Sequence, residues 1–162
     1  MKTDKKHEKT NAVRILERAG ADFDVVTYEL PEGAEFSGAL VRQALDADPE
    51  ITYKTLCARG RSGSIAVFCI PAESELDLKK AAAAAGEKSV ELVHVKELRD
   101  LTGYERGAVS PFGMKKAYPT YLEEAAQLWD RILVSGGAKG CSVSVSPAKI
   151  LEITGAKFAD LV

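Results

Sequence analysis

The chain has 162 residues, of which 46% are hydrophobic and 28% charged, and its net charge at neutral pH is −2. This balance is typical of one globular domain with its own core, and it excludes a general polyanion-binding protein. No apolar run approaches the roughly 20 residues of a transmembrane helix. Residues 1–9 are Lys-rich and precede no apolar segment of a signal peptide, so we expect a flexible tail, a single domain over 10–162 and a cytoplasmic location.

The first third of the chain carries clear signals for local structure. Gly20 follows a run of helical spacing and fits a C-terminal helix cap, and Ser37 fits an N-terminal one. A turn containing Gly60 and Gly63 separates two β-rich runs, which is typical of a hairpin. The elements expected here are a helix over 10–19, a strand over 23–28, a helix over 37–45, and hairpin strands over 53–58 and 64–70.

The remaining chain alternates helices and strands around one irregular segment. Residues 102–120 combine three glycines and two prolines without periodicity, and such a long loop is usually functional. Hairpins mixed with crossover helices predict a mixed α/β fold, a mixed sheet with helices around it. The elements expected here are helices over 76–85, 96–101 and 146–154, and strands over 90–93, 131–134, 141–145 and, at a sheet edge, within 156–162.

Cysteine and histidine are too sparse and too scattered for a metal site. Cys57, Cys69 and Cys141 form no CxxC pair and are odd in number, which argues against a disulfide framework. The histidines are His7, in the tail, and His94, which we expect to be structural. No nucleotide-binding or serine-hydrolase motif is present. We therefore expect no metal and no cofactor.

Lys54 is the most informative single residue. Because side chains alternate along a strand, Lys54 shares a face with Leu56 and Ala58. It either reaches solvent from the start of the strand or places a positive charge at a cavity, aimed at a phosphate or a developing oxyanion. The other basic residues that could form a nucleic-acid patch are Arg59, Arg61, Lys115, Lys116 and Lys139, each also typical of a solvated surface.

Two glycine-rich segments offer backbone N–H groups in place of catalytic side chains. One surrounds Gly107, and the other is the loop over 135–140, between two predicted strands. Backbone N–H groups in such loops can bind a phosphate or an oxyanion, and glycine lets a ligand approach closely. The alternative is ordinary turn geometry.

Five short segments stand out along the chain: Tyr53-Lys54-Thr55-Leu56, Leu76-Asp77-Leu78-Lys79-Lys80, the stretch from Thr102 to Gly113 with Ser110-Pro111-Phe112, Val134-Ser135-Gly136-Gly137, and Ala156-Lys157-Phe158-Ala159-Asp160. Taken together, in order and spacing, they resemble the YbaK/EbsC family of aminoacyl-tRNA deacylases, which is related to the editing domain of bacterial prolyl-tRNA synthetases. The resemblance extends from about residue 10 to the C-terminus. It implies a strongly curved mixed sheet or near-barrel with flanking helices.

The resemblance also assigns site residues. The family's essential lysine falls on Lys54, and the backbone that contacts the carbonyl falls around Gly107 and Ala108, so these three are the expected catalytic positions. The expected substrate-binding positions are Tyr28, Phe36, Thr55, Val109, Ser110, Ser135, Gly136, Gly137 and Ser142. Two of these positions depart from the family pattern: Ala108 replaces a second glycine, and Ser142 replaces an acidic residue.

The implied activity is removal of a mischarged amino acid from tRNA, with cysteine on tRNA(Pro) as the first choice. In cysteine-specific members the substrate's own thiol attacks its carbonyl, so no enzymic nucleophile is needed. The alternatives are an alanyl-tRNA(Pro) deacylase of the same superfamily and a non-catalytic module that binds aminoacyl-tRNA or a synthetase. The expected partners are the acceptor end of an aminoacyl-tRNA and prolyl-tRNA synthetase, for a monomer or homodimer.

Overall fold

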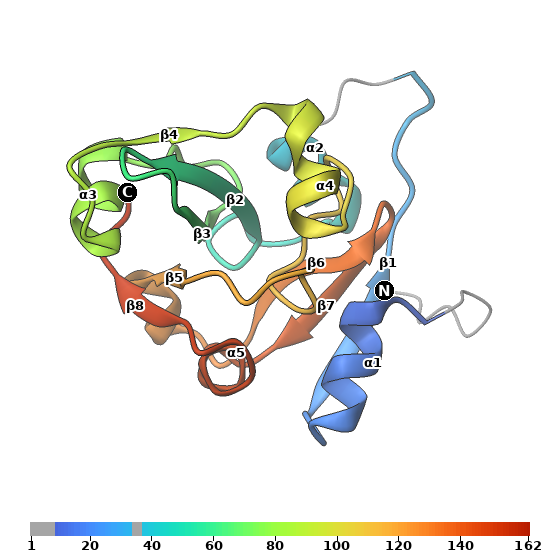
Figure 1. Ribbon diagram of the computed structural model, residues 1–162. Coiled ribbons are helices and arrows are strands. Elements are labelled where there is room, and N and C mark those ends of the chain that lie inside the picture. The colour runs from blue at the N-terminus through green and yellow to red at the C-terminus, as the bar shows by residue number, and fades with distance from the viewer. Residues whose placement is uncertain (1–8, 34–36) are drawn as a thin grey trace.

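The computed structural model describes residues 9–33 and 37–162, which form two β-sheets with helices around them (Figure 1). The predicted mixed α/β class is confirmed. Residues 1–8 of the expected tail over 1–9, with His7, and the expected pocket residue Phe36 lie outside the described residues. Within the described ranges, no helix has both the length and the apolar character to cross a bilayer.

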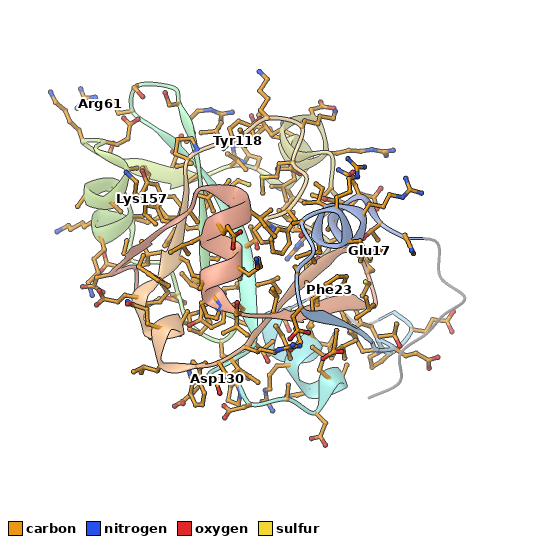
Figure 2. The ribbon with its side chains drawn as sticks, turned by 90° about the horizontal axis from the view of Figure 1, so that it is seen from below. Glu17, Phe23, Arg61, Tyr118, Asp130 and Lys157 are labelled. Atoms are coloured by element: carbon orange, nitrogen blue, oxygen red, sulfur yellow. The ribbon has the colours of Figure 1, made fainter. Side chains whose placement is uncertain are left out.

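One sheet is three-stranded and antiparallel. Its order is β1 (Phe23–Thr27), β7 (Cys141–Val145) and β6 (Ile132–Ala138), with β7 in the centre. Helices α1 (Asn11–Arg18) and α5 (Pro147–Thr154) lie on the same side of the molecule in Figures 1 and 2. Their apolar residues share one core with these strands, whose fully buried members include Ala12, Leu16, Ile132, Val143, Val145 and Ile150.

The second sheet is five-stranded and mixed. Its order is β4-β2-β3-β5-β8, with antiparallel pairing among β4, β2 and β3 and parallel pairing among β3, β5 and β8. Helix α3 (Leu78–Ala85) packs on it through two buried alanines. The strands are β2 (Tyr53–Gly60), β3 (Ile65–Pro71), β4 (Val90–Leu92), β5 (Thr120–Glu123) and β8 (Lys157–Ala159).

The two sheets meet without closing into a barrel. An isolated parallel bridge joins Thr52 to Leu133, and the Leu133 N–H donates to the Ile51 carbonyl at 2.8 Å. The remaining helices are α2 (Gly38–Leu45), α4 (Leu98–Thr102) and two 3-10 turns, η1 (Val95–Glu97) and η2 (Glu124–Leu128).

Local signals placed the helix ends correctly. Ser37 and Ser146 accept the predicted capping hydrogen bonds, each at 3.1 Å, from the Leu40 and Lys149 N–H groups. α3 begins two residues later than expected, because the Asp77 carboxylate caps it. Gly155 follows α5 with a φ of 73°, the left-handed conformation that glycine adopts without strain.

Two strands differ from expectation. β5 was not predicted: it has four residues and ends in Glu123, a buried carboxylate that accepts N–H groups of Ala125 at 2.7 Å and Leu161 at 2.9 Å. The expected loop over 135–140 is mostly strand, because β6 continues to Ala138 with an irregularity in its pairing after Ser135. The final strand is at a sheet edge, as predicted.

Candidate active site

A pocket of about 460 Å³ opens between the two sheets. This volume is typical of pockets that enclose a small molecule. Its walls come from β2, α2, the segment from β4 to α4, the loop around Gly107, and the three-stranded sheet. The predicted site residues that line it are Tyr28, Lys54, Thr55, Gly107, Val109, Ser135 and Ser142.

The pocket borders an uncovered edge of β2. β4 pairs with β2 only over residues 58–60, so in the described chain no strand pairs with residues 53–57 on that side, and all five line the pocket. On the other side β2 is paired with β3 along its length, which fixes its backbone. Thr55 directs its hydroxyl toward the Cys69 thiol on β3, 3.6 Å away. Lys54 and Thr55 are therefore held by a rigid strand at the edge of an open space.

Lys54 supplies a positive charge to this pocket. The residue is half-buried, and burial lowers the pKa of its ammonium group, with a weaker opposing effect from the Glu75 carboxylate. Within residues 9–33 and 37–162, no carboxylate lies within 4.0 Å of the Lys54 ammonium. Of the two interpretations of this lysine, the structure favours the one that places it at a cavity. A poorly solvated cation that has no carboxylate partner in the described part of the chain is well suited to bind an anion.

Hydroxyl groups from the three-stranded sheet form a second wall, which we call the hydroxyl wall: Tyr28, Ser135 and Ser142. Ser142 lies in the central strand and is only 4% exposed, opposite Ser135 in the register. Burial raises the pKa of Tyr28, although hydrogen bonds with Gly140 and with the Ser142 side chain act in the opposite direction. Tyr28 is therefore a neutral phenol at neutral pH, and this wall is polar and uncharged.

The loop around Gly107 reaches the pocket in part. Gly107, with a φ of 88°, and Val109 line it. The Ala108 N–H donates to the Glu105 carbonyl at 2.9 Å, so it is committed to a turn. Among the described residues only Asp46 combines a side chain with a positive φ, so the backbone accommodates Ala108 without strain. Ser110 is fully buried and accepts the Phe112 N–H at 3.2 Å.

Gly136 and Gly137 pack against protein rather than against the pocket. The Gly136 carbonyl accepts the Thr10 hydroxyl at 2.5 Å, and a Cβ at Gly136 would lie 2.5 Å from the Cys141 Sγ. A Cβ at Gly137 would lie 3.0 Å from the Tyr104 ring. In this structure both glycines allow the end of β6 to pack closely against α1 and β7.

Nucleophilic and metal chemistry find little support in the described chain. Cys57 lines the pocket, but burial raises the pKa of its thiol to about 12, and Cys69 is shifted to about 11 by the same cause. Both thiols are protonated at neutral pH and therefore weakly nucleophilic. No group of three or more metal-ligating side chains occurs in the part of the chain that the structure describes. His94 is exposed at the start of η1, where its N–H donates to Glu97.

Sequence reasoning missed one wall and one cation of the pocket. The wall is the apolar segment between β4 and α4, and the cation is Arg106, which is exposed beside Gly107. Neither carries a motif, and their placement depends on tertiary packing. Arg59, expected in a turn, lies in β2 and pairs with Glu97 at 2.9 Å. Figure 2 shows Arg61 at the tip of the β2–β3 hairpin.

Comparison with known proteins identifies the family. The model of the aminoacyl-tRNA editing domain matches residues 37–153, so the chain belongs to this family. A protein of Enterococcus faecalis named "Putative Cys-tRNA(Pro)/Cys-tRNA(Cys) deacylase EbsC" is 40% identical over 97% of this chain and 95% of its own. The Bacillus subtilis protein YwhH, described as uncharacterized, is 24% identical over 76% of this chain and 80% of its own.

Solved structures agree with the family and the fold. The "crystal structure of a putative trans-editing enzyme for prolyl tRNA synthetase" is similar at a TM-score of 0.78 and 28% identity, covering 95% of this chain and 98% of the other. The hypothetical protein APE2540 shares the fold at a TM-score of 0.83 and 22% identity, over 94% and 99% of the two chains. The resemblance seen in the sequence is thereby confirmed.

Proposed function

We propose that this protein is a trans-editing deacylase that releases cysteine from mischarged tRNA(Pro). The observation that carries the proposal is the pocket between the sheets, which combines the half-buried Lys54 cation with an uncharged hydroxyl wall. The editing-domain match and the name of the 40% identical relative support the same activity.

The chemistry requires little from the protein's side chains. An aminoacyl ester is already activated, so holding it in position and stabilising the developing oxyanion supply much of the rate. Lys54 would neutralise negative charge on the terminal adenosine's phosphate or on the reacting oxygen. The N–H groups of Gly107 and Val109 are the candidates for the carbonyl, because the Ala108 N–H already donates to Glu105.

For a cysteine ester the substrate supplies the nucleophile. Its sulfur bonds to its own carbonyl carbon, the ester C–O bond breaks, and the thiol proton passes to the departing ribose oxygen. The protein folds the substrate into this geometry and limits its contact with water. This route agrees with protein thiols that burial keeps protonated.

The first experiment compares three substrates. Purified protein and a Lys54→Ala variant are incubated with tRNA(Pro) charged separately with cysteine, alanine or proline, and the remaining aminoacyl-tRNA is measured over time. We expect loss of cysteine alone, and a rate at least about a hundredfold lower in the variant, as for removal of one oxyanion-stabilising group. Faster loss of alanine than of cysteine would show that Ala-tRNA(Pro), the alternative substrate, is the preferred one.

A second arm adds prolyl-tRNA synthetase, the protein partner that we propose. Activity only in its presence would assign the synthetase a role in delivering the tRNA. If all three substrates stay charged with the synthetase present, the deacylase proposal fails, and a non-catalytic aminoacyl-tRNA-binding module takes its place.

A further inference from the structure

Four apolar residues of the segment from β4 to α4 line the pocket, and we call them the shelf: Leu92, Val93, Val95 and Leu98. Leu92 is 48% exposed and Val95 is 53% exposed. The other large hydrophobic side chains exposed in the described chain, Leu78, Leu128 and Val162, do not line this pocket. An exposed apolar surface that adjoins a pocket is a candidate for ligand contact.

The shelf is held rigidly against β2. The Val93 N–H donates to the Cys57 carbonyl at 3.1 Å, directly beyond the last paired residue of β4. Arg59 on β2 pairs with Glu97 at 2.9 Å, and Glu97 also accepts the His94 N–H at 3.1 Å. Val93 and Leu98 pack against a buried cluster, so the half-exposed Leu92 and Val95 are presented on a fixed support.

We propose that the shelf receives the adenine base at the 3′ end of the aminoacyl-tRNA. This inference rests on the proposed deacylase function and adds a location for the base. The tRNA body stays in solvent, so its last nucleotide lies near the rim while the esterified amino acid enters the pocket. A base is flat, with apolar faces, and binds through those faces without sequence readout.

The distribution of polarity separates the base from the amino acid. The α-ammonium and carbonyl of the amino acid need hydrogen-bond partners, which the hydroxyl wall and the Gly107 backbone offer. Cysteine is too small to cover four apolar side chains, whereas adenine is large enough. Arg106 lies at the same rim, exposed and with no carboxylate within 4.0 Å among the described residues. It is placed to meet the phosphate that precedes the base.

Two stable analogues separate the contribution of the adenine base to binding from that of the amino acid and the ribose. The first is 3′-cysteinylamino-3′-deoxyadenosine, in which an amide replaces the ester. The second is the same compound with hydrogen in place of adenine. Calorimetry would compare their Kd values for the wild-type protein, for the double variant Leu92→Gln/Val95→Gln, and for Leu128→Gln. Leu128 is 82% exposed in η2 and lies outside the pocket, which makes it a matched control.

We expect the wild type and Leu128→Gln to bind the adenine-containing analogue about tenfold more tightly than the base-free one, the scale of a small apolar contact in a pocket. The double variant should lose this difference and bind the base-free analogue as the wild type does. With Cys-tRNA(Pro) as substrate, the double variant should show a higher KM and a nearly unchanged kcat. Circular dichroism would check that the three proteins are equally folded.

Equal affinity of the wild type for both analogues would overturn the shelf assignment, as would an unchanged adenine contribution in the double variant. Loss of synthetase binding in the double variant, with adenine binding intact, would assign the shelf to a protein partner instead. Failure of the deacylase proposal is a separate result. In that case the wild-type protein would leave Cys-tRNA(Pro) intact. Calorimetry would still show whether it binds the adenine-containing analogue more tightly than the base-free one.

Discussion

The two sheets contribute different chemistry to one pocket. The three-stranded sheet brings neutral hydroxyls, of which Ser142 is buried and lies opposite Ser135 in the strand register. The five-stranded sheet brings the Lys54 cation and carries the apolar shelf. One side is suited to a small polar group and the other to an anion and a flat base. Neither sheet alone therefore forms the site. The bridge between Thr52 and Leu133 joins the two sheets and so keeps the two sides of the pocket together.

The largest expected effect concerns the cation of the five-stranded side. Burial lowers the pKa of Lys54. Its ammonium group is charged below that pKa, and as pH rises it loses the charge earlier than an exposed lysine does. Binding of the amide analogue of Cys-tRNA(Pro), which resists alkaline hydrolysis, should weaken up to about tenfold per pH unit above that pKa. Titration from about pH 7 to about pH 10 would measure this.

Lys54→Arg sharpens the result, because arginine keeps its charge throughout that range. The variant should bind more weakly near neutral pH, since its planar group differs in shape, but its affinity should fall less steeply than that of the wild type as pH rises, because only the ligand's own groups then titrate. Identical pH profiles for the wild type and the variant would show that another group controls binding.

A smaller effect is expected where the three-stranded side is most tightly packed. In Gly136→Ala the new methyl meets the Cys141 Sγ, and such overpacking costs about 1–3 kcal/mol of unfolding free energy. Thermal unfolding would measure it as a lower Tm. Adding Cys141→Ala removes the sulfur and should restore part of the loss. A single variant as stable as the wild type, or a pair with no recovery, would contradict this packing account.

The smallest effect is expected at the hydroxyl wall itself. Ser142→Ala removes one buried hydroxyl from the pocket, and the loss of one substrate hydrogen bond, worth about 1 kcal/mol, corresponds to roughly a fivefold rise in KM. Ser144→Ala is the matched control, on the same strand but not lining the pocket. Kinetics on Cys-tRNA(Pro) would compare them. Equal KM values for both variants would remove Ser142 from the substrate contacts.

The sequence predicted those parts of the fold that depend on local signals. Ser37 and Ser146 cap helices where expected, because a capping hydroxyl acts within three residues. β5 was not predicted, because a glutamate such as its last residue, Glu123, is typical of a surface position. Its burial depends on N–H groups of Ala125 and of Leu161, and Leu161 is far along the chain. The continuation of β6 was missed because Gly136 and Gly137 resemble a turn.

The candidate site was predictable where a motif exists and not elsewhere. Lys54 stood out as a charge within an apolar strand, and the family resemblance added the residues around it. The shelf has no such signal, because Leu92 and Val95 are ordinary apolar residues until β4 stops short of the end of β2 and leaves them at the pocket rim. Arg106 likewise acquires its significance from the fold.

The pairing of β1 with β7 has a consequence for biosynthesis. Five strands lie between these two in the chain, yet Val26 and Ser142 are direct neighbours in the sheet. During synthesis on the ribosome, β1 therefore has no β7 to pair with until most of the domain has been made. Contacts between residues this distant in sequence also form slowly. A nascent chain that already contains Lys54 still lacks Ser135 and Ser142 of the hydroxyl wall. On the function proposed above, which uses both sides of the pocket, we expect deacylation only from chains whose synthesis is nearly finished.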